Sequence, residues 1–231
     1  MKFTVGILFA CAFFVYQLYH HKLGVLMNKI KSFLSVLALS VGFSANAAIV
    51  ELGGAEVGAF NIDASVASFE DFYALGTVNR YSTALPFAEE NTAVFFVGQL
   101  NSSLALFGLF DAYSSAATDA GTAVFDYTFN QGTGAYTLID DPREAVSGSQ
   151  VSFEWNEFNG DGFVLELNPG NNIDLDAVLT GVTGLDNGFK FLSFDSNNQA
   201  TDIALASGDF NLSVNVPEPT SIAIMGLSLL G

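Results

Sequence analysis

The sequence predicts an all-β protein: a single antiparallel β-sandwich or jelly-roll domain, flanked by an N-terminal signal helix and a short C-terminal apolar helix. Three observations favour the β-domain. Short stretches of alternating apolar and polar residues recur through the second half of the chain. Turn sequences rich in Gly, Asn and Asp separate them. Amphipathic stretches long enough for the helices of a parallel α/β fold are missing, and many short strands at this spacing are typical of a sandwich or jelly-roll.

Each predicted strand places apolar side chains on one face and polar side chains on the other, because successive residues of a strand point to opposite sides. The strands are predicted over Ala123–Phe129, Val151–Trp155, Phe163–Leu167, Phe189–Phe194 and Phe210–Val216. Turns are predicted at residues 131–134, 159–162, 168–170 and 186–188. Residues 69–73, which carry three aromatic side chains, are predicted as a further strand with two aromatics in the core, and residues 111–121 as a loop or short helix.

Charge divides sharply along the chain. The first 31 residues hold four of the seven basic residues, whereas all 24 Asp and Glu residues follow Ala48. From Ile49 onward the net charge is therefore about −21 (3 minus 24). A surface this acidic repels phosphate backbones, which argues against nucleic acid as a partner.

A signal peptide is predicted over residues 27–48. Lys29 and Lys31 form a basic start, Phe33–Phe43 is a short apolar run, and Ala45, Ala47 and Ala48 form the small-residue cleavage region. We expect signal peptidase to cleave after Ala47 or Ala48.

Residues 1–26 have two interpretations. Their apolar run, 3–18, is marginal for a membrane span. Either Met27 is the true start and the preceding residues are a mis-assigned extension, or they form an additional anchor or part of a long signal. We favour the first, because Met27 begins a complete signal by itself.

The C-terminal residues 216–231 open with two prolines around a glutamate and continue as an apolar run. The prolines make an extended segment that neither a helix nor a sheet absorbs. The motif consists of Val216, Pro217, Glu218, Pro219 and Thr220. This segment resembles the PEP-CTERM sorting signal, which implies processing by an exosortase, an integral-membrane cysteine peptidase, and association of the family with extracellular polysaccharide and biofilm of Gram-negative bacteria.

The resemblance implies further features that this chain lacks. In that family the motif precedes a membrane helix and a basic cluster, whereas here only 10 residues follow Ser221 and none is basic. Ten residues are about half of a membrane span. The tail is therefore short or truncated, and we expect it to associate with the membrane only transiently.

The acidic β-sandwich domain is predicted over residues 49–215, and its composition restricts its chemistry. Cys11, His20 and His21 all precede Ile49, so the domain has no residues for Ser-His-Asp or Cys-His catalysis or for ordinary zinc and copper sites. No Gly-rich phosphate-binding sequence is present. We therefore expect no enzymatic activity and no obligatory cofactor.

The remaining acidic residues offer one weaker chemical interpretation. Glu154 and Glu157 are a candidate acid and base for glycoside cleavage, although their spacing in a strand places them on opposite faces. Asp140, Asp141 and Glu144 are most simply a charged turn around a proline.

Calcium is the more credible ligand, because hard cations prefer oxygen ligands. The candidate residues are Asn171, Asn172, Asp174 and Asp176, after a Pro-Gly turn. Similar oxygen-rich loops lie at residues 159–162 and 195–198. None of the three fits the EF-hand pattern, and Asn and Asp are also common in turns for backbone reasons.

Together these features predict a protein exported across the inner membrane to the cell surface or extracellular matrix, with a structural or adhesive role in biofilm or exopolysaccharide. Its expected partners are signal peptidase, an exosortase and extracellular polysaccharide. The alternative is a calcium-assisted carbohydrate-binding module that stacks sugars on Trp155 and tyrosines, unless Trp155 is a core residue. A secreted glycoside hydrolase that uses only carboxylates is a third interpretation.

Overall fold

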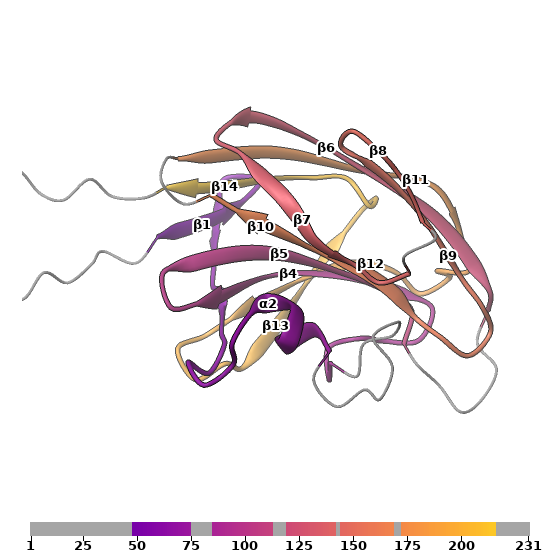
Figure 1. Ribbon diagram of the computed structural model, residues 1–231, viewed down its shortest axis with the longest axis horizontal. Helices are drawn as coiled ribbons and strands as arrows, with labels where there is room; N and C mark the ends of the chain where they lie inside the picture. The colour runs from indigo at the N-terminus through magenta and orange to yellow at the C-terminus, as the bar shows by residue number, and fades with distance from the viewer. Residues whose placement is uncertain (1–47, 75–84, 113–118, 142–143, 169–171, 216–231) are drawn as a thin grey trace, which may run out of the picture. The chain divides into compact units, whose positions relative to one another are not determined.

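Two facing β-sheets of seven strands each make up the protein's β-sandwich, which confirms the predicted fold class (Figure 1). The computed structural model describes residues 48–74, 85–112, 119–141, 144–168 and 172–215. The predicted signal and C-terminal helices, Ala45, Ala47 and the motif at residues 216–220 lie outside these ranges. Among the described residues, no helix has the length and apolar character needed to cross a membrane.

The first sheet is antiparallel throughout. Its strands, in spatial order, are β2 (Ala55–Val57), β1 (Ile49–Leu52), β14 (Phe210–Asn215), β11 (Ile173–Thr183), β6 (Gly121–Gln131), β9 (Gln150–Trp155) and β8 (Ala145–Ser147). The alternation seen in the sequence is visible in their burial: in β14 and β9, every second side chain is buried.

The second sheet is mixed, so the prediction of an entirely antiparallel domain is wrong here. Its order is β13 (Ala200–Leu205), β12 (Gly188–Phe194), β4 (Thr92–Leu100), β5 (Ser103–Phe110), β10 (Asp161–Leu167) and β7 (Gly134–Ile139). Along one edge of β4, β12 pairs in parallel with Thr92–Phe96, and β3 (Phe60–Asn61) pairs in parallel with Gly98 and Gln99. Alternation of side chains specifies which face is buried but not strand direction, so it could not reveal these parallel pairs.

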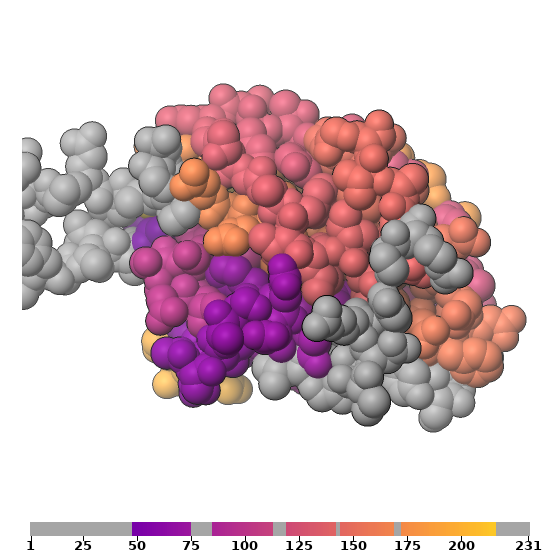
Figure 2. Space-filling view, viewed as in Figure 1, coloured from indigo at the N-terminus to yellow at the C-terminus, as the bar shows by residue number. Residues whose placement is uncertain are grey.

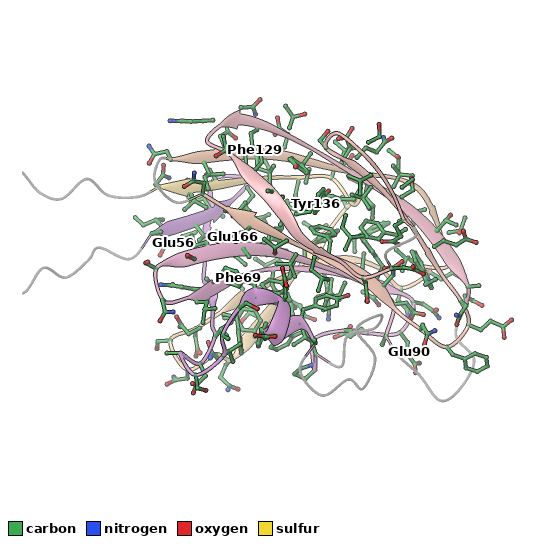
Figure 3. The ribbon with its side chains drawn as sticks, in the orientation of Figure 1. Glu56, Phe69, Glu90, Phe129, Tyr136 and Glu166 are labelled. Atoms are coloured by element: carbon green, nitrogen blue, oxygen red, sulfur yellow. The ribbon has the colours of Figure 1, made fainter. Side chains whose placement is uncertain are left out.

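A core of aromatic and aliphatic side chains fills the space between the sheets. Phe163 of β10 lies at its centre, with its ring centroid 4.4 Å from that of Phe125 on β6. Tyr136 of β7 and Phe129 of β6 are partly buried and pack against the same core (Figure 3). Every aromatic residue on the strands of the first sheet packs into this core: Phe125, Tyr127, Phe129, Phe153, Trp155 and Phe210.

A second core, here called the outer core, covers the other face of the second sheet. Phe96 and Phe107 stack at 4.7 Å on neighbouring strands, and Phe72 packs edge-on against Phe107. The covering segment contains β3 and the helix α2 (Phe69–Tyr73), seen in indigo at the surface in Figure 2. Because both faces of β4 and β5 are buried, the sequences of these strands are nearly continuous apolar runs.

The helix α2 replaces the strand predicted at residues 69–73. Ser68 caps it, since the Ser68 side-chain oxygen accepts a hydrogen bond from the Asp71 backbone N–H at 3.1 Å. Phe69, Phe72 and Tyr73 all face the second sheet and are buried. Spacings of three and four residues place side chains on one face of a helix, so the aromatics are buried as predicted, but by helical geometry.

The first and last described strands of the domain are neighbours. β1 and β14 pair in antiparallel register, with Ile49 opposite Asn215 and Val50 opposite Val214 (Figure 1). The chain therefore enters and leaves the sandwich at one end of the first sheet.

Candidate functional site

The outer face of the first sheet carries a row of hydrogen-bonded polar side chains, here called the polar ladder. It crosses four neighbouring strands, β1, β14, β11 and β6. Its members are Glu51, Asn130, Asp174, Asp176, Asn211, Ser213 and Asn215. These residues alternate with core residues along their strands, so the pattern that builds the core also places them together on the opposite face.

Two of the predicted calcium ligands lie in this ladder. Asp174 and Asp176 belong to β11 and point to the same side, two residues apart. The Asn211 side-chain amide donates to Asp174 Oδ1 at 2.7 Å and to Asp176 Oδ1 at 2.9 Å. Asn130 Nδ2 donates to Asp176 Oδ2 at 2.8 Å. These amide bonds lower the pKa of Asp176, so it is ionised at neutral pH.

Two of the four predicted calcium ligands, Asp174 and Asp176, thus lie in a strand and not in a loop. Asn172 directly precedes β11, and Asn171 lies outside the described residues. In the described ranges, no group of three or more Asp, Glu, His or Cys side chains is arranged to hold a metal ion. Calcium binding at Asn171, Asn172, Asp174 and Asp176 stays a prediction from the sequence.

The loop at residues 195–198 is explained by its own hydrogen bonds. Asp195 Oδ1 accepts from the backbone N–H groups of Asn197 and Gln199, each at 2.8 Å. Asn198, at a positive φ of 59°, exchanges two hydrogen bonds with the backbone of Asn61 on β3. The loop therefore fixes β3 to the β12–β13 turn, a structural use of the Asn and Asp residues.

The sugar-stacking role of Trp155 is wrong. Its side chain is only 4% exposed, and its ring stacks on Phe110 inside the sandwich core. Its indole N–H donates to the backbone oxygen of Asp119 at 3.2 Å. All aromatic residues on the strands of the first sheet also point inward, so these strands place no aromatic side chain on the outer face for a sugar ring.

The two glutamates considered for glycoside cleavage do not share a built pocket. Glu154 lies on β9 with its side chain exposed, and Glu157 lies in the turn that follows. Glu154 pairs across the sheet with Thr122 of β6, so it stands on the outer face.

An open pocket of about 590 Å³ surrounds the ammonium group of Lys190 on β12. Glu89, Glu90, Thr92, Asn187 and Asp202 supply polar groups around it. Lys190 Nζ donates to Glu89 and, at 3.1 Å, to Asp202 Oδ2. Burial lowers the pKa of Lys190, but its hydrogen bonds to the two carboxylates outweigh burial and raise it overall. A lysine held in its charged form is not a nucleophile, so the pocket does not support lysine-based catalysis.

The expected charged turn at residues 140–144 buries two of its three carboxyl groups. Asp140 is 3% exposed, and both side-chain oxygens of Glu144 are buried. Asp161, predicted as part of a turn, is 4% exposed. Asp and Glu beside proline resemble a solvated turn in any sequence, so no local signal distinguished these residues.

No protein-family model matches the chain, and a search of curated proteins returns no match.

Proposed function

We propose that this protein is exported and processed by an exosortase, and that its β-sandwich serves a structural or adhesive role at the cell surface or in the extracellular matrix. The observation that carries the proposal is the pairing of β1 with β14, with Ile49 opposite Asn215. The predicted cleavage region ends at Ala48, and the predicted sorting motif begins at Val216. The residues predicted for both processing steps are therefore next in the sequence to the ends of paired strands, which supports processing that leaves the sandwich intact.

The surface of the domain supports a non-enzymatic role in a hydrated matrix. The polar ladder presents amides, carboxylates and a hydroxyl that already satisfy one another. Such a face binds water and polyols through many weak hydrogen bonds and needs no deep cleft. The high negative charge keeps the protein soluble where divalent cations and polyanions are abundant.

Fractionation tests the processing. Cells with and without the exosortase should be separated into membrane, surface and medium fractions, and both ends of the mature protein determined by mass spectrometry. We expect an N-terminus after Ala47 or Ala48 and a shortened C-terminus in exosortase-positive cells. Replacing Pro217, Glu218 and Pro219 by alanine should retain the intact tail in the membrane fraction, while the neighbouring Ser221→Ala should be processed normally.

The same variants test the role in the matrix. A strain that lacks the gene should lose matrix-bound biomass in a static biofilm assay, and the wild-type gene should restore it while the alanine variant of the motif should not. An intact tail in both strains would contradict the processing. Normal biofilm in the strain that lacks the gene would contradict the structural or adhesive role.

A further inference from the structure

Three carboxyl groups gather under α2, where the chain enters and leaves the 140–144 turn. Asp140 follows β7, Glu144 precedes β8, and Asp161 begins β10. The Asp140 backbone N–H donates to the Gly162 carbonyl oxygen at 3.0 Å, which extends the pairing of β7 with β10 by one residue. The 140–144 turn and the start of β10 thus bring three acidic side chains into one small volume.

Contacts from the surrounding elements fix the position of this carboxyl cluster. Tyr73 of α2, fully buried, donates its hydroxyl to Asp140 Oδ2 at 2.8 Å. The Gly162 backbone N–H donates to Asp161 Oδ1 at 2.7 Å. A Cβ atom on Gly162 would lie 2.6 Å from the Tyr73 hydroxyl, so the packing leaves no room for a side chain there.

Four carboxyl oxygens of the cluster are buried and make no hydrogen bond of ordinary geometry: Asp140 Oδ1, Asp161 Oδ2 and both oxygens of Glu144. The Glu154 backbone N–H lies near Glu144 and Asp161 and lowers the pKa of each, but burial outweighs it. Glu144 and Asp161 face each other closely enough for one carboxyl to donate to the other once it holds a proton. Ionised carboxylates buried without donors or cations are strongly unfavourable, so the cluster must be neutralised.

No positively charged side chain among the described residues neutralises the carboxyl cluster. Within the described ranges, the titratable groups that face the cluster are Tyr73 from α2, Asp140 and Asp141 after β7, Glu144 before β8, and Asp161 from β10, and each of these is acidic or phenolic. From β9, only the Glu154 backbone N–H faces it. The one lysine in the described ranges, Lys190, is paired with Glu89 and Asp202. In these ranges the acidic groups are also not arranged as a metal-ligand set.

We propose that the carboxyl cluster is a pH switch built into the fold: it holds protons at neutral pH, and losing them at alkaline pH weakens the attachment of α2 and of the segment around Glu144 to the second sheet. Burial raises the pKa of Asp140 to about 8, although the hydrogen bond from Tyr73 lowers it. Burial, together with the neighbouring Asp161 carboxyl, raises the pKa of Glu144 far above its usual value.

The direction of the effect follows from proton linkage. Free Asp and Glu in an unfolded chain titrate near pH 4, so between about pH 4 and the raised pKa the native state holds protons that the unfolded state has lost. The stability is greatest at low pH within this window and falls as pH rises. Each proton held only by the native state makes the unfolding equilibrium constant increase about tenfold per pH unit.

The composition of the chain simplifies a measurement of stability against pH. From Ile49 onward the chain has no His and no Cys, so ordinary side chains do not titrate between about pH 6 and pH 9. The new α-amino group left by processing is the remaining titrating group in that range, and it is common to all variants.

Urea unfolding of the protein recovered from its producing cells, measured from pH 6 to pH 9, tests the proposal. We expect the wild-type midpoint to fall with rising pH. Glu144→Gln, which keeps a donor for Asp161, and Asp161→Asn should each flatten the dependence. Asp176→Asn, which removes an ionised carboxylate from the exposed polar ladder, is the matched control and should keep the wild-type slope.

Infrared spectroscopy provides a readout that does not depend on the stability of a variant. The wild-type protein at pH 7 should show the carbonyl-stretch band of a protonated carboxyl, and Glu144→Gln should weaken it. Absence of that band at pH 7 together with a flat urea midpoint would overturn the proposal. The proposal would also be overturned if the urea midpoint fell with rising pH only after calcium was removed with a chelator. In that case a cation, and not protons, would neutralise the carboxyl cluster. Any group before Ile49, including His20, His21 and Cys11, titrates alike in the wild type and in every variant. The difference in slope from the Asp176→Asn control therefore decides this test whether or not the chain is processed, so it and the test of the proposed function fail independently.

Discussion

The hydroxyl of Tyr73 is the only donor that the Asp140 side chain has among the described residues, and its removal should be costly. Tyr73→Phe leaves a buried carboxyl oxygen without a partner, a change that typically costs about 1–3 kcal/mol. The cost should be larger at pH 9 than at pH 6, because the hydrogen bond favours the ionised form of Asp140 and lowers its pKa. Urea unfolding at both pH values measures it.

A second tyrosine provides the control. Tyr127 is partly buried against the sandwich core, and we expect Tyr127→Phe to change the free energy of unfolding by less than about 0.5 kcal/mol at either pH. Equal losses from the two substitutions would show that the Tyr73 hydroxyl has no special role in the cluster.

For single residues, the sequence predicted the kind of side chain and its local structure better than it predicted whether that side chain is buried. Trp155 was recognised as either a core residue or a sugar platform, and burial against Phe110 decides for the core. Asp140 and Glu144 were expected as a charged turn, because proline and acidic residues favour turns locally. Their burial depends on α2 and β10, which are distant in sequence, so no local pattern could have revealed it.

The cover formed by α2 is held to the second sheet mainly by aromatic packing. Phe72 contacts Phe60 at 5.3 Å and Phe107 at 5.7 Å between ring centroids, and it is buried. Phe72→Ala should therefore destabilise the domain by about 3–5 kcal/mol, through lost burial and the cavity left behind. Thermal unfolding followed by circular dichroism would detect a loss of this size.

Phe158→Ala is the matched control for that substitution. Its side chain is 48% exposed in the turn after β9, so we expect a change of less than about 0.5 kcal/mol. If Phe72→Ala also lowered the free energy of unfolding by less than about 0.5 kcal/mol, this would contradict the view that the outer core stabilises the fold.

The alternation of apolar and polar residues predicted some strands and missed others: β11, which has one exposed face, was expected in part as a calcium-binding loop. The alternating patterns identified β6, β9, β10, β12 and β14. The strands β4 and β5 carry apolar residues on both faces, so they lack alternation, and the signal that could have found them is an uninterrupted apolar run of strand length. The helix α2 is only five residues long, too short for a helical period to be recognised.

For the whole molecule, the dominant property is a charge of about −21 from Ile49 onward (3 minus 24). Repulsion among exposed carboxylates opposes folding, and salt screens it over a distance that falls from about 10 Å at 0.1 M to about 3 Å at 1 M. Composition alone predicts this property. The site of any ion-specific effect depends on which carboxylates the sheets bring together.

Sodium and calcium chloride at equal ionic strength should separate screening from specific binding. We expect both salts to raise the melting temperature by a similar amount, because Asp174 and Asp176 already accept amide hydrogen bonds from Asn211 and Asn130. If calcium binds at the predicted site, calcium alone should raise the melting temperature further, and Asp174→Asn and Asp176→Asn should each abolish that additional rise. Glu56→Gln, which changes the same charge on exposed strand β2, is the control and should leave any such excess intact. If calcium adds stability that only the β11 substitutions abolish, then these aspartates exchange their amide partners for the ion, and the polar ladder is a cation site and not merely a hydrated face.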